Sequence, residues 1–263
     1  MAQRLRQLLR GILTVRFQPT EDTVVALISY FLVVGSLFTA FQVFTTQAVA
    51  ANFITYGPIT MVALGVGIPA LYTTLVRRRP LSDVGITSKH LVPSLVLGIL
   101  LGAQTYFATT ATLNVAWTID HLPLVTLGLA VGLYEAIFFR GWLQLRFEAA
   151  FGLLPGLFLG AICYSLYHVG YGMTPGEMMV LFVLGLVFGA TFRLTRNILL
   201  LWPFYTPMGG MYTYINDGLT MPLPAALGFI ITLALMAAVI VVASRLSRHS
   251  SEGLVAIQSA GSI

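Results

Sequence analysis

A glutamate and a histidine stand in two neighbouring apolar stretches of the chain. Glu135 lies in YEAIFFRGW and His168 lies in CYSLYHVGYG. An ionisable side chain at the centre of a membrane costs about 2.5–3.5 kcal/mol, so it usually serves a function. A carboxylate and an imidazole on adjacent helices are the groups that general-base activation of water requires. The pair predicts a hydrolytic site inside a membrane, and Tyr164, four residues before His168, shares its helix face.

Each of these residues also has a purely structural interpretation. Glu135 can pair with Arg140, and His168 can be an interior histidine bonded to a carbonyl or to a tyrosine. Residues five apart lie about 140° apart around an α-helix, which is a poor geometry for a direct bond. We therefore expect Arg140 to extend towards the inner membrane interface, as long basic side chains do near helix ends.

A third group of polar residues lies in NILLLWPFYTPMGGMYTY. Its two prolines and two glycines predict a broken helix, because irregular backbone at membrane depth is tolerated where protein buries it or where it lines a wet cavity. Tyr205 and Thr206 would supply hydroxyl donors at the break. The alternative is a kink that serves packing alone.

The composition is that of an integral membrane protein. Of the 263 residues, 57% are hydrophobic and only 9% are charged, whereas soluble domains carry about 25% charged residues. The net charge of +5 does not indicate a nucleic-acid partner, because no basic run is interleaved with aromatic residues. Cys163 is the single cysteine, so no internal disulfide is possible.

Eight segments are apolar and long enough to cross a bilayer, which takes roughly 20 residues per helix. They are Thr23–Phe44, Tyr56–Val76, Leu91–Trp117, Leu122–Leu145, Leu153–Tyr171, Glu177–Leu194, Asn197–Ile215 and Leu223–Ser244. With eight spans, thirteen of the 14 basic residues fall on one side, and the other is Arg140. Basic residues accumulate in cytoplasmic loops. The sequence therefore predicts an all-α bundle of eight transmembrane helices in the plasma membrane, with both termini cytoplasmic.

The flanks of this bundle have separate predictions. Residues 1–20 have leucines at helical spacing opposite arginines, which predicts a basic amphipathic helix in the inner interface. Residues 21–246 form the membrane domain, and residues 247–263 are Ser/Gly-rich and predict a disordered tail. The TPGE sequence at Thr174–Glu177 is typical of a capping box, so Glu177 is assigned to capping and not to catalysis.

Four sequence motifs resemble one family of membrane proteases. EAIFFRG resembles the first motif, EExxxR, of the CAAX prenyl protease and bacteriocin-processing family, and YSLYH is similar to the second, FxxxH. RRRPLSDVGIT resembles the loop ahead of the family's core, and TRNILLLWP resembles the entry to the third motif, HxxxN. The resemblance covers roughly Arg77 to Tyr214 and implies an eight-span intramembrane endopeptidase.

The resemblance implies a role for each candidate residue. The catalytic residues would be Glu135, His168, Arg140 and Tyr205, and the substrate-binding residues Tyr164, Phe139 and Thr206. Glu135 and His168 would polarise a water for attack on a peptide bond of a membrane-associated protein or peptide. Some family members are described as metalloproteases and others as metal-free. A single Glu and His make a poor zinc site, so we expect no cofactor and leave zinc open.

Two departures from the family pattern keep other functions open. Ala136 stands in the position of the second glutamate, and the third motif has no histidine, with Tyr205 or, after a one-residue slip, Thr206 in its place. An inactive relative that serves as a membrane scaffold or immunity factor is therefore one alternative. A small transporter is another, although no internal repeat supports it. The expected partners are a peptide substrate and the lipid bilayer, without nucleic acid. Other protease types fit less well, because HExxH is absent and Ser165 lacks glycine neighbours.

Overall fold

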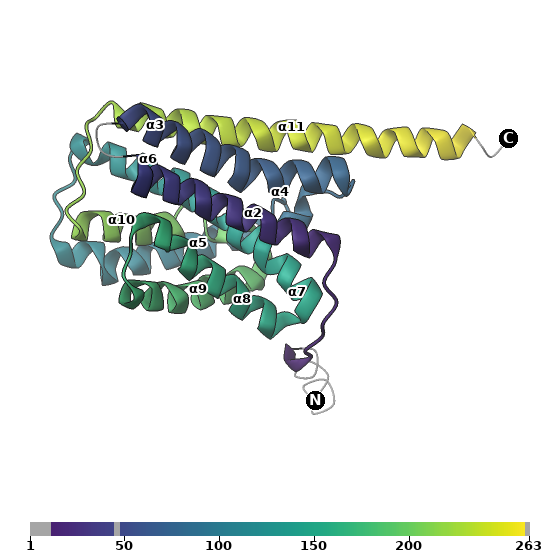
Figure 1. Cartoon of the computed structure of the whole chain (residues 1–263), viewed down its shortest axis with the longest axis horizontal. Coiled ribbons are helices and arrows are strands. Elements are labelled where there is room, and N and C mark those ends of the chain that lie inside the picture. Colours follow the sequence, from purple (N-terminus) through teal and green to yellow (C-terminus); the bar gives the residue numbers. More distant parts are fainter. Residues whose placement is uncertain (1–11, 45–47, 261–263) are drawn as a thin grey trace.

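The protein is a bundle of helices (Figure 1). The computed structural model describes residues 12–44 and 48–260, and no β-strand occurs among them. Seven helices in this part of the chain are long and apolar enough to cross a membrane: Glu21–Val43, Val49–Val76, Leu91–Leu113, Ile119–Phe151, Leu153–Tyr171, Pro175–Thr195 and Ala225–Ser247. The predicted all-α, multi-pass membrane class is therefore confirmed.

Several of these long helices combine α-helical, 3₁₀-helical and π-helical pieces. The first consists of α2 (Glu21–Phe38) and η1 (Thr39–Val43), and the second of α3 (Val49–Ile54), η3 (Thr55–Gly67), α4 (Ile68–Leu71) and η4 (Tyr72–Val76). After η5 (Leu81–Val84), the third consists of α5 (Leu91–Ala108) and η6 (Thr110–Leu113), and the fourth of η7 (Ile119–His121), α6 (Leu122–Glu135), η8 (Ala136–Gln144) and α7 (Leu145–Phe151). The others are α8 (Leu153–Leu166) with η9 (Tyr167–Tyr171), then α9 (Pro175–Thr195) and α11 (Ala225–Ala260).

The eighth predicted segment, Asn197–Ile215, is not one of these seven long helices. It consists of η10 (Ile198–Leu200), a turn and α10 (Tyr205–Asn216), which has 12 residues. Pro203 precedes α10 and Pro207 lies in its first turn, where a missing N–H costs least. The break predicted from the prolines is present, and it leaves pieces too short to cross a bilayer as one regular helix.

The helix that contains Glu135 and Arg140 lies at the centre of the bundle. The most apolar window of Ile119–Phe151 is 83% buried, against 17–56% for the other six long helices. Within it, α6 packs against α10, α11 and η3, and η8 packs against α8. A helix that is apolar all round becomes buried on every side. Glu135 and Arg140, in the middle of this helix, are therefore held in the protein interior.

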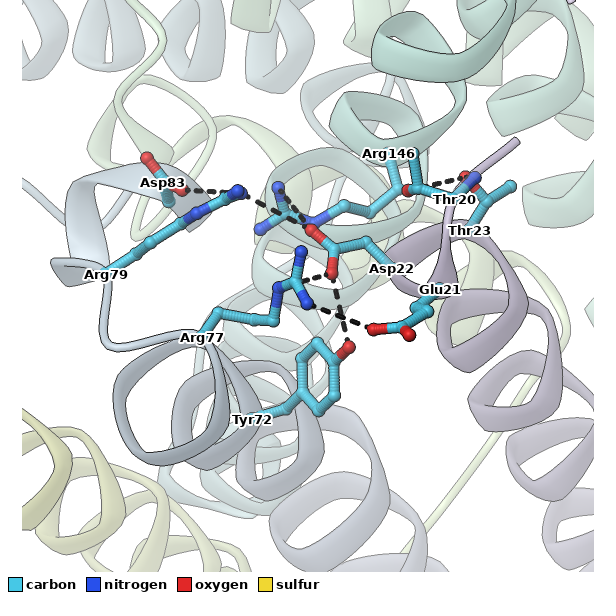
Figure 2. A network of polar contacts seen from close by, with 9 residues as sticks. All are labelled: Thr20, Glu21, Asp22, Thr23, Tyr72, Arg77, Arg79, Asp83 and Arg146. Atoms are coloured by element: carbon cyan, nitrogen blue, oxygen red, sulfur yellow. Dashed lines mark hydrogen bonds and ion pairs between the residues drawn. The ribbon is translucent and has the colours of Figure 1, made fainter. Parts of the chain in front are cut away.

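A network of charged side chains fastens α2 to the loop after η4 and to α7 (Figure 2). The Asp22 carboxylate lies 2.9 Å from Arg77 Nε, 3.4 Å from Arg79 Nη1 and 3.9 Å from Arg146 Nη1. It also accepts a hydrogen bond of 3.2 Å from the Tyr72 hydroxyl. We call these five residues the inner charge network. It binds together three segments that are distant in the sequence.

The two ends of the described chain differ from their predictions. Residues 14–20 are not helical: the Arg16 and Gln18 N–H groups donate to the Phe151 and Ala150 carbonyls, and Pro19 disfavours helix in the residue before it. The rest of the predicted N-terminal helix, residues 1–11, lies outside the described residues. At the other end α11 reaches Ala260, into the predicted disordered tail, because no proline interrupts it. Both ends lie towards the same end of the bundle (Figure 1).

Candidate active site

Glu135 is the last residue of α6, and two tyrosines hold its carboxylate. The Tyr164 hydroxyl donates to Oε2 at 3.4 Å, and the Tyr167 hydroxyl donates to Oε1. Both sequence neighbours, Tyr134 and Ala136, are buried, while Glu135 keeps some accessible surface. The carboxylate is thus fixed in orientation by the fifth long helix and still accessible to a molecule of the size of water.

His168 lies beside the same two tyrosines. Its Nδ1 is 2.8 Å from the Tyr164 carbonyl oxygen, and its ring centroid is 4.1 Å from that of Tyr167 and 5.1 Å from that of Tyr164. A carbonyl oxygen only accepts, so in the neutral ring Nδ1 carries the hydrogen and Nε2 keeps a free lone pair. The 3₁₀ turn η9 thus places a potential proton acceptor next to the tyrosines that hold Glu135.

Glu135 and His168 are therefore brought into one cluster through shared neighbours. No hydrogen bond or ion pair joins them directly in the described part of the chain. Phe139, predicted as a substrate contact, is completely buried, with its ring 4.5 Å from Tyr167 and 5.4 Å from Tyr164. Phe139 therefore packs against the rings of both tyrosines. We call Glu135, Tyr164, Tyr167, His168 and Phe139 the Glu135 cluster.

Tyr167 is the member of this cluster that sequence reasoning missed. It stands directly before His168 in YSLYH and three residues after Tyr164. This spacing is the available signal, because residues three apart share a helix face and a hydroxyl at that position reaches the same neighbour. The family pattern FxxxH leaves the position unspecified, so the resemblance alone gave no reason to single it out.

Arg140 does not reach the membrane interface, and that expectation was wrong. Its side chain is 2% exposed, and its guanidinium carbon lies 4.7 Å from the centroid of the Tyr164 ring. The reason is the π-helical geometry of η8, which begins immediately after Glu135. In a helix with i→i+5 hydrogen bonds the turn is wider, so residues five apart lie closer to one face than residues five apart in an α-helix do. Glu135 and Arg140 consequently both face Tyr164.

The start of α10 packs against the face of α6 that leads to Glu135. A Cβ added to Gly132 would lie 2.9 Å from Pro207 and 3.0 Å from the Thr206 hydroxyl, so only glycine permits this approach. Gly132 is three residues before Glu135 and shares its face. The Tyr205 ring instead packs edge-on against Phe188, with centroids 5.1 Å apart. Of the two hydroxyls predicted at the break, Thr206 is the one in contact with the helix of Glu135.

The loop ahead of the core and the entry to the third motif are fastened to each other. The buried Asn197 side chain donates to the Thr87 and Lys89 carbonyls, both at 2.9 Å, and accepts from the Leu199 N–H at 2.9 Å. In addition, the Trp202 indole N–H donates to the Leu129 carbonyl of α6 at 2.9 Å. These bonds fix where α10 begins. Sequence analysis did not single out Asn197 or Trp202 for this role.

Glu177 lies away from the cluster, in the capping position that the sequence predicts. The Thr174 N–H donates to its Oε2 at 2.6 Å, and the Glu177 N–H donates to the Thr174 hydroxyl at 3.4 Å. The capping box at the start of α9 is confirmed.

The donor set around Glu135 does not suit a catalytic zinc ion. The described residues contain no group of three or more His, Cys, Asp or Glu side chains that could hold a metal. Glu135 and His168 offer two ligands, whereas catalytic zinc sites normally use three from the protein.

The comparison with protein families concerns this same region. Residues 116–206 match the family described as type II CAAX prenyl endopeptidase Rce1-like. This stretch of the chain is Rce1-like. The Rce1-like stretch includes every residue that the motifs assigned to the site, and the recognition made from the motifs is confirmed. The chain is accordingly a multi-pass membrane protein related to a protease family. No curated protein and no solved structure matches it.

Proposed function

We propose that the protein is an intramembrane endopeptidase that hydrolyses a peptide bond of a membrane-associated protein or peptide. The observation that carries the proposal is the Glu135 carboxylate, held through both oxygens by tyrosines that also contact His168, within the Rce1-like stretch. A buried carboxylate beside an imidazole is an expensive arrangement in a membrane, and catalysis gives it a reason.

In the proposed mechanism Glu135 is the general base. It takes a proton from a water while the water oxygen attacks the peptide carbonyl, a contribution of about a hundred- to ten-thousandfold to the rate. Nε2 of His168, with its free lone pair, holds the same water on the other side. Tyr164 and Tyr167 keep the carboxylate in position, and Phe139 supports them.

The residues at the start of α10 would contact the substrate. The proximity of the Thr206 hydroxyl to Gly132 supports a substrate contact by Thr206 next to Glu135. Tyr205 has its ring against Phe188 and would be a second hydroxyl donor at the same turn. The Tyr164 hydroxyl donates to Glu135, and its ring contacts the Arg140 guanidinium. Tyr164 would therefore line the path of the substrate.

The direct test is cleavage of membrane-tethered peptide reporters by the purified protein. We expect cleavage by the unmutated protein, none by Glu135→Gln and almost none by His168→Ala. Glu177→Gln is the matched control, because it removes a glutamate that only caps a helix. Activity should survive a chelator, since no cofactor is proposed; loss with chelator and recovery with zinc would overturn that part.

A scaffold or immunity factor is the second candidate, and the missing third-motif histidine favours it. A protein of this kind would show no cleavage across a broad reporter panel while remaining folded. The third possibility from the sequence is a transporter. Only the broken segment at α10 supports it. Uptake of solute into vesicles without any proteolysis would favour it.

We also propose eight membrane crossings with both termini cytoplasmic, in the plasma membrane. The sorting of the basic residues supports this, and η10 and α10 would together make the additional crossing. Single cysteines introduced into a Cys163→Ser background test it. A cysteine at Asp120 or Asp217 should react with an impermeant reagent from outside the cell, and one at Lys89 should not. The reverse pattern would refute the orientation.

A further inference from the structure

Arg140 is a buried cation without a carboxylate partner. Its side chain is 2% exposed, and its Nη1 is buried with no hydrogen-bond acceptor. No carboxylate lies within ion-pair distance of the guanidinium in the part of the chain that the structure describes. A buried arginine normally needs a paired acceptor, since the loss of hydration is large. This guanidinium is thus positioned to bind an oxygen that arrives with a ligand.

Arg146 lies one and a half helical turns further along and, unlike Arg140, has a carboxylate partner. It also lies over an aromatic ring, 4.8 Å from that of Trp142, but its Nη1 is 3.9 Å from the Asp22 carboxylate. Among the described residues, Arg140 has a ring contact but no carboxylate within ion-pair distance. The difference is a consequence of the sequence, because the residue four before Arg140 is Ala136, which is buried and carries no acceptor.

The unpaired guanidinium and the Glu135 carboxylate share one neighbour, Tyr164. Arg140 covers the ring of Tyr164, and the hydroxyl of that same tyrosine donates to Glu135. Arg140 and Glu135 thus contact the same tyrosine, although no ion pair joins them in the part of the chain that the structure describes. A substrate carbonyl that approaches a water held by Glu135 therefore comes into the field of Arg140.

The first step of peptide hydrolysis creates a negative oxygen in that field. As the water oxygen bonds to the carbonyl carbon, its proton passes to Glu135 and the carbonyl π electrons move to the oxygen. Collapse then re-forms the carbonyl, breaks the C–N bond and gives the proton to the leaving amine. Fixed donors that meet the oxyanion are worth about a hundred- to a thousandfold each.

We propose that Arg140 stabilises this oxyanion through Nη1, in place of the histidine that the third motif lacks. The proposal rests on the proposed peptidase function. It explains two departures from the family pattern together: without a glutamate at position 136 the guanidinium stays unpaired, and an unpaired guanidinium can serve where no third-motif histidine exists. The substrate group that it recognises is the scissile peptide carbonyl.

The experiment restores the missing partner and leaves Arg140 itself in place. Ala136→Glu puts a carboxylate four residues before Arg140, and cleavage of the membrane-tethered reporter is measured together with thermal unfolding. We expect the kcat of the folded protein to fall about a hundredfold or more, with little change in KM, and thermal unfolding reports how well the buried site accepts the larger side chain. Arg140→Gln should lower kcat similarly, and Arg146→Gln, the matched control, should lower stability while the folded fraction keeps its kcat.

A second variant keeps the test independent of whether the new glutamate fits. Arg140→Ala should regain cleavage when methylguanidinium is added at millimolar concentration, and Arg146→Ala should show no such gain in kcat. Full cleavage by Ala136→Glu would show that Arg140 has only a structural role. The same conclusion would follow if Arg140→Ala lost cleavage only in proportion to its loss of folded protein. If the unmutated protein cleaves nothing, or Glu135→Gln cleaves at the unmutated rate, the peptidase proposal fails and this one with it.

Discussion

Two carboxylates in the interior of this molecule, the buried Asp22 and the partly buried Glu135, have opposite surroundings. Asp22 lies among the arginines of the inner charge network, where Arg77, Arg79 and Arg146 face it from two other segments (Figure 2). Glu135 lies among tyrosine hydroxyls, and the nearby Arg140 does not reach it. Both carboxylates are held by several donors. Only the first is neutralised by paired charges.

The difference teaches which of the two regions is built for stability. An ion pair holds a carboxylate in its charged form and makes it a poor proton acceptor, whereas neutral hydroxyls orient a carboxylate without placing a full positive charge beside it. The inner charge network also joins three distant segments, which a stabilising contact should do. The Glu135 carboxylate and the Arg140 guanidinium, by contrast, are not paired with each other, and an unpaired charge inside a membrane is a cost that function would explain. Matched substitutions in the two regions can break or sharpen this comparison.

The largest effect is expected from Glu135→Gln. The change keeps the shape of the side chain and removes the group that accepts a proton, so kcat should fall by about a hundred- to ten-thousandfold. Thermal unfolding should be unchanged, because tyrosine hydroxyls can pair with an amide as well as with a carboxylate. Reporter cleavage and unfolding are measured on the same preparation. Normal cleavage by this variant would remove Glu135 from the mechanism and with it one side of the comparison.

Asp22→Asn makes the same chemical change in the inner charge network, but it should lower stability and leave activity unchanged. Unfolding free energy should fall by on the order of 3 kcal/mol, the lower end for a broken buried pair, because Arg77 and Arg79 retain contact with solvent. The kcat of the molecules that remain folded should not change. Denaturation in detergent, monitored by circular dichroism, gives the first quantity. An unaltered unfolding curve would show that the network contributes nothing measurable.

Tyr167→Phe tests whether hydroxyls position the Glu135 carboxylate. A hydrogen bond to a charged group contributes about 1.5–3 kcal/mol, so the removal of the Tyr167 donor should lower kcat about ten- to a hundredfold. The ring remains and keeps its packing with Phe139, so stability should hold. Steady-state kinetics separates kcat from KM. A change in KM alone would indicate that Tyr167 contacts substrate and does not orient Glu135.

The smallest effect is expected from Tyr72→Phe, the corresponding change in the inner charge network. The Tyr72 hydroxyl is one of several donors to Asp22, at 3.2 Å, and the arginines remain when it is lost. Unfolding free energy should fall by about 0.5–1.5 kcal/mol, and kcat should stay the same. A tenfold loss of kcat in this variant would show that the two regions are coupled and that the comparison is too simple.

The amino-acid sequence by itself determined the membrane class and the seven long helices of the described residues. It also determined the capping box at Thr174–Glu177 and the two motifs around Glu135 and His168. These features depend on composition, on runs of apolar residues and on contacts within a few residues, all of which can be read locally. The broken segment could be predicted for the same reason, because prolines act on their own backbone.

The tertiary structure alone decided how charges are paired and which hydroxyls meet Glu135. Arg140 was expected at the interface because the sequence was read with an α-helical repeat, and the π-helical turns of η8 turned it towards Tyr164 instead. Asp22 meets Arg77 and Arg146, and Asn197 meets Thr87 and Lys89, across separations that no local pattern encodes. A sequence specifies which side chains are costly to bury, but packing between distant helices determines which partner each one finds.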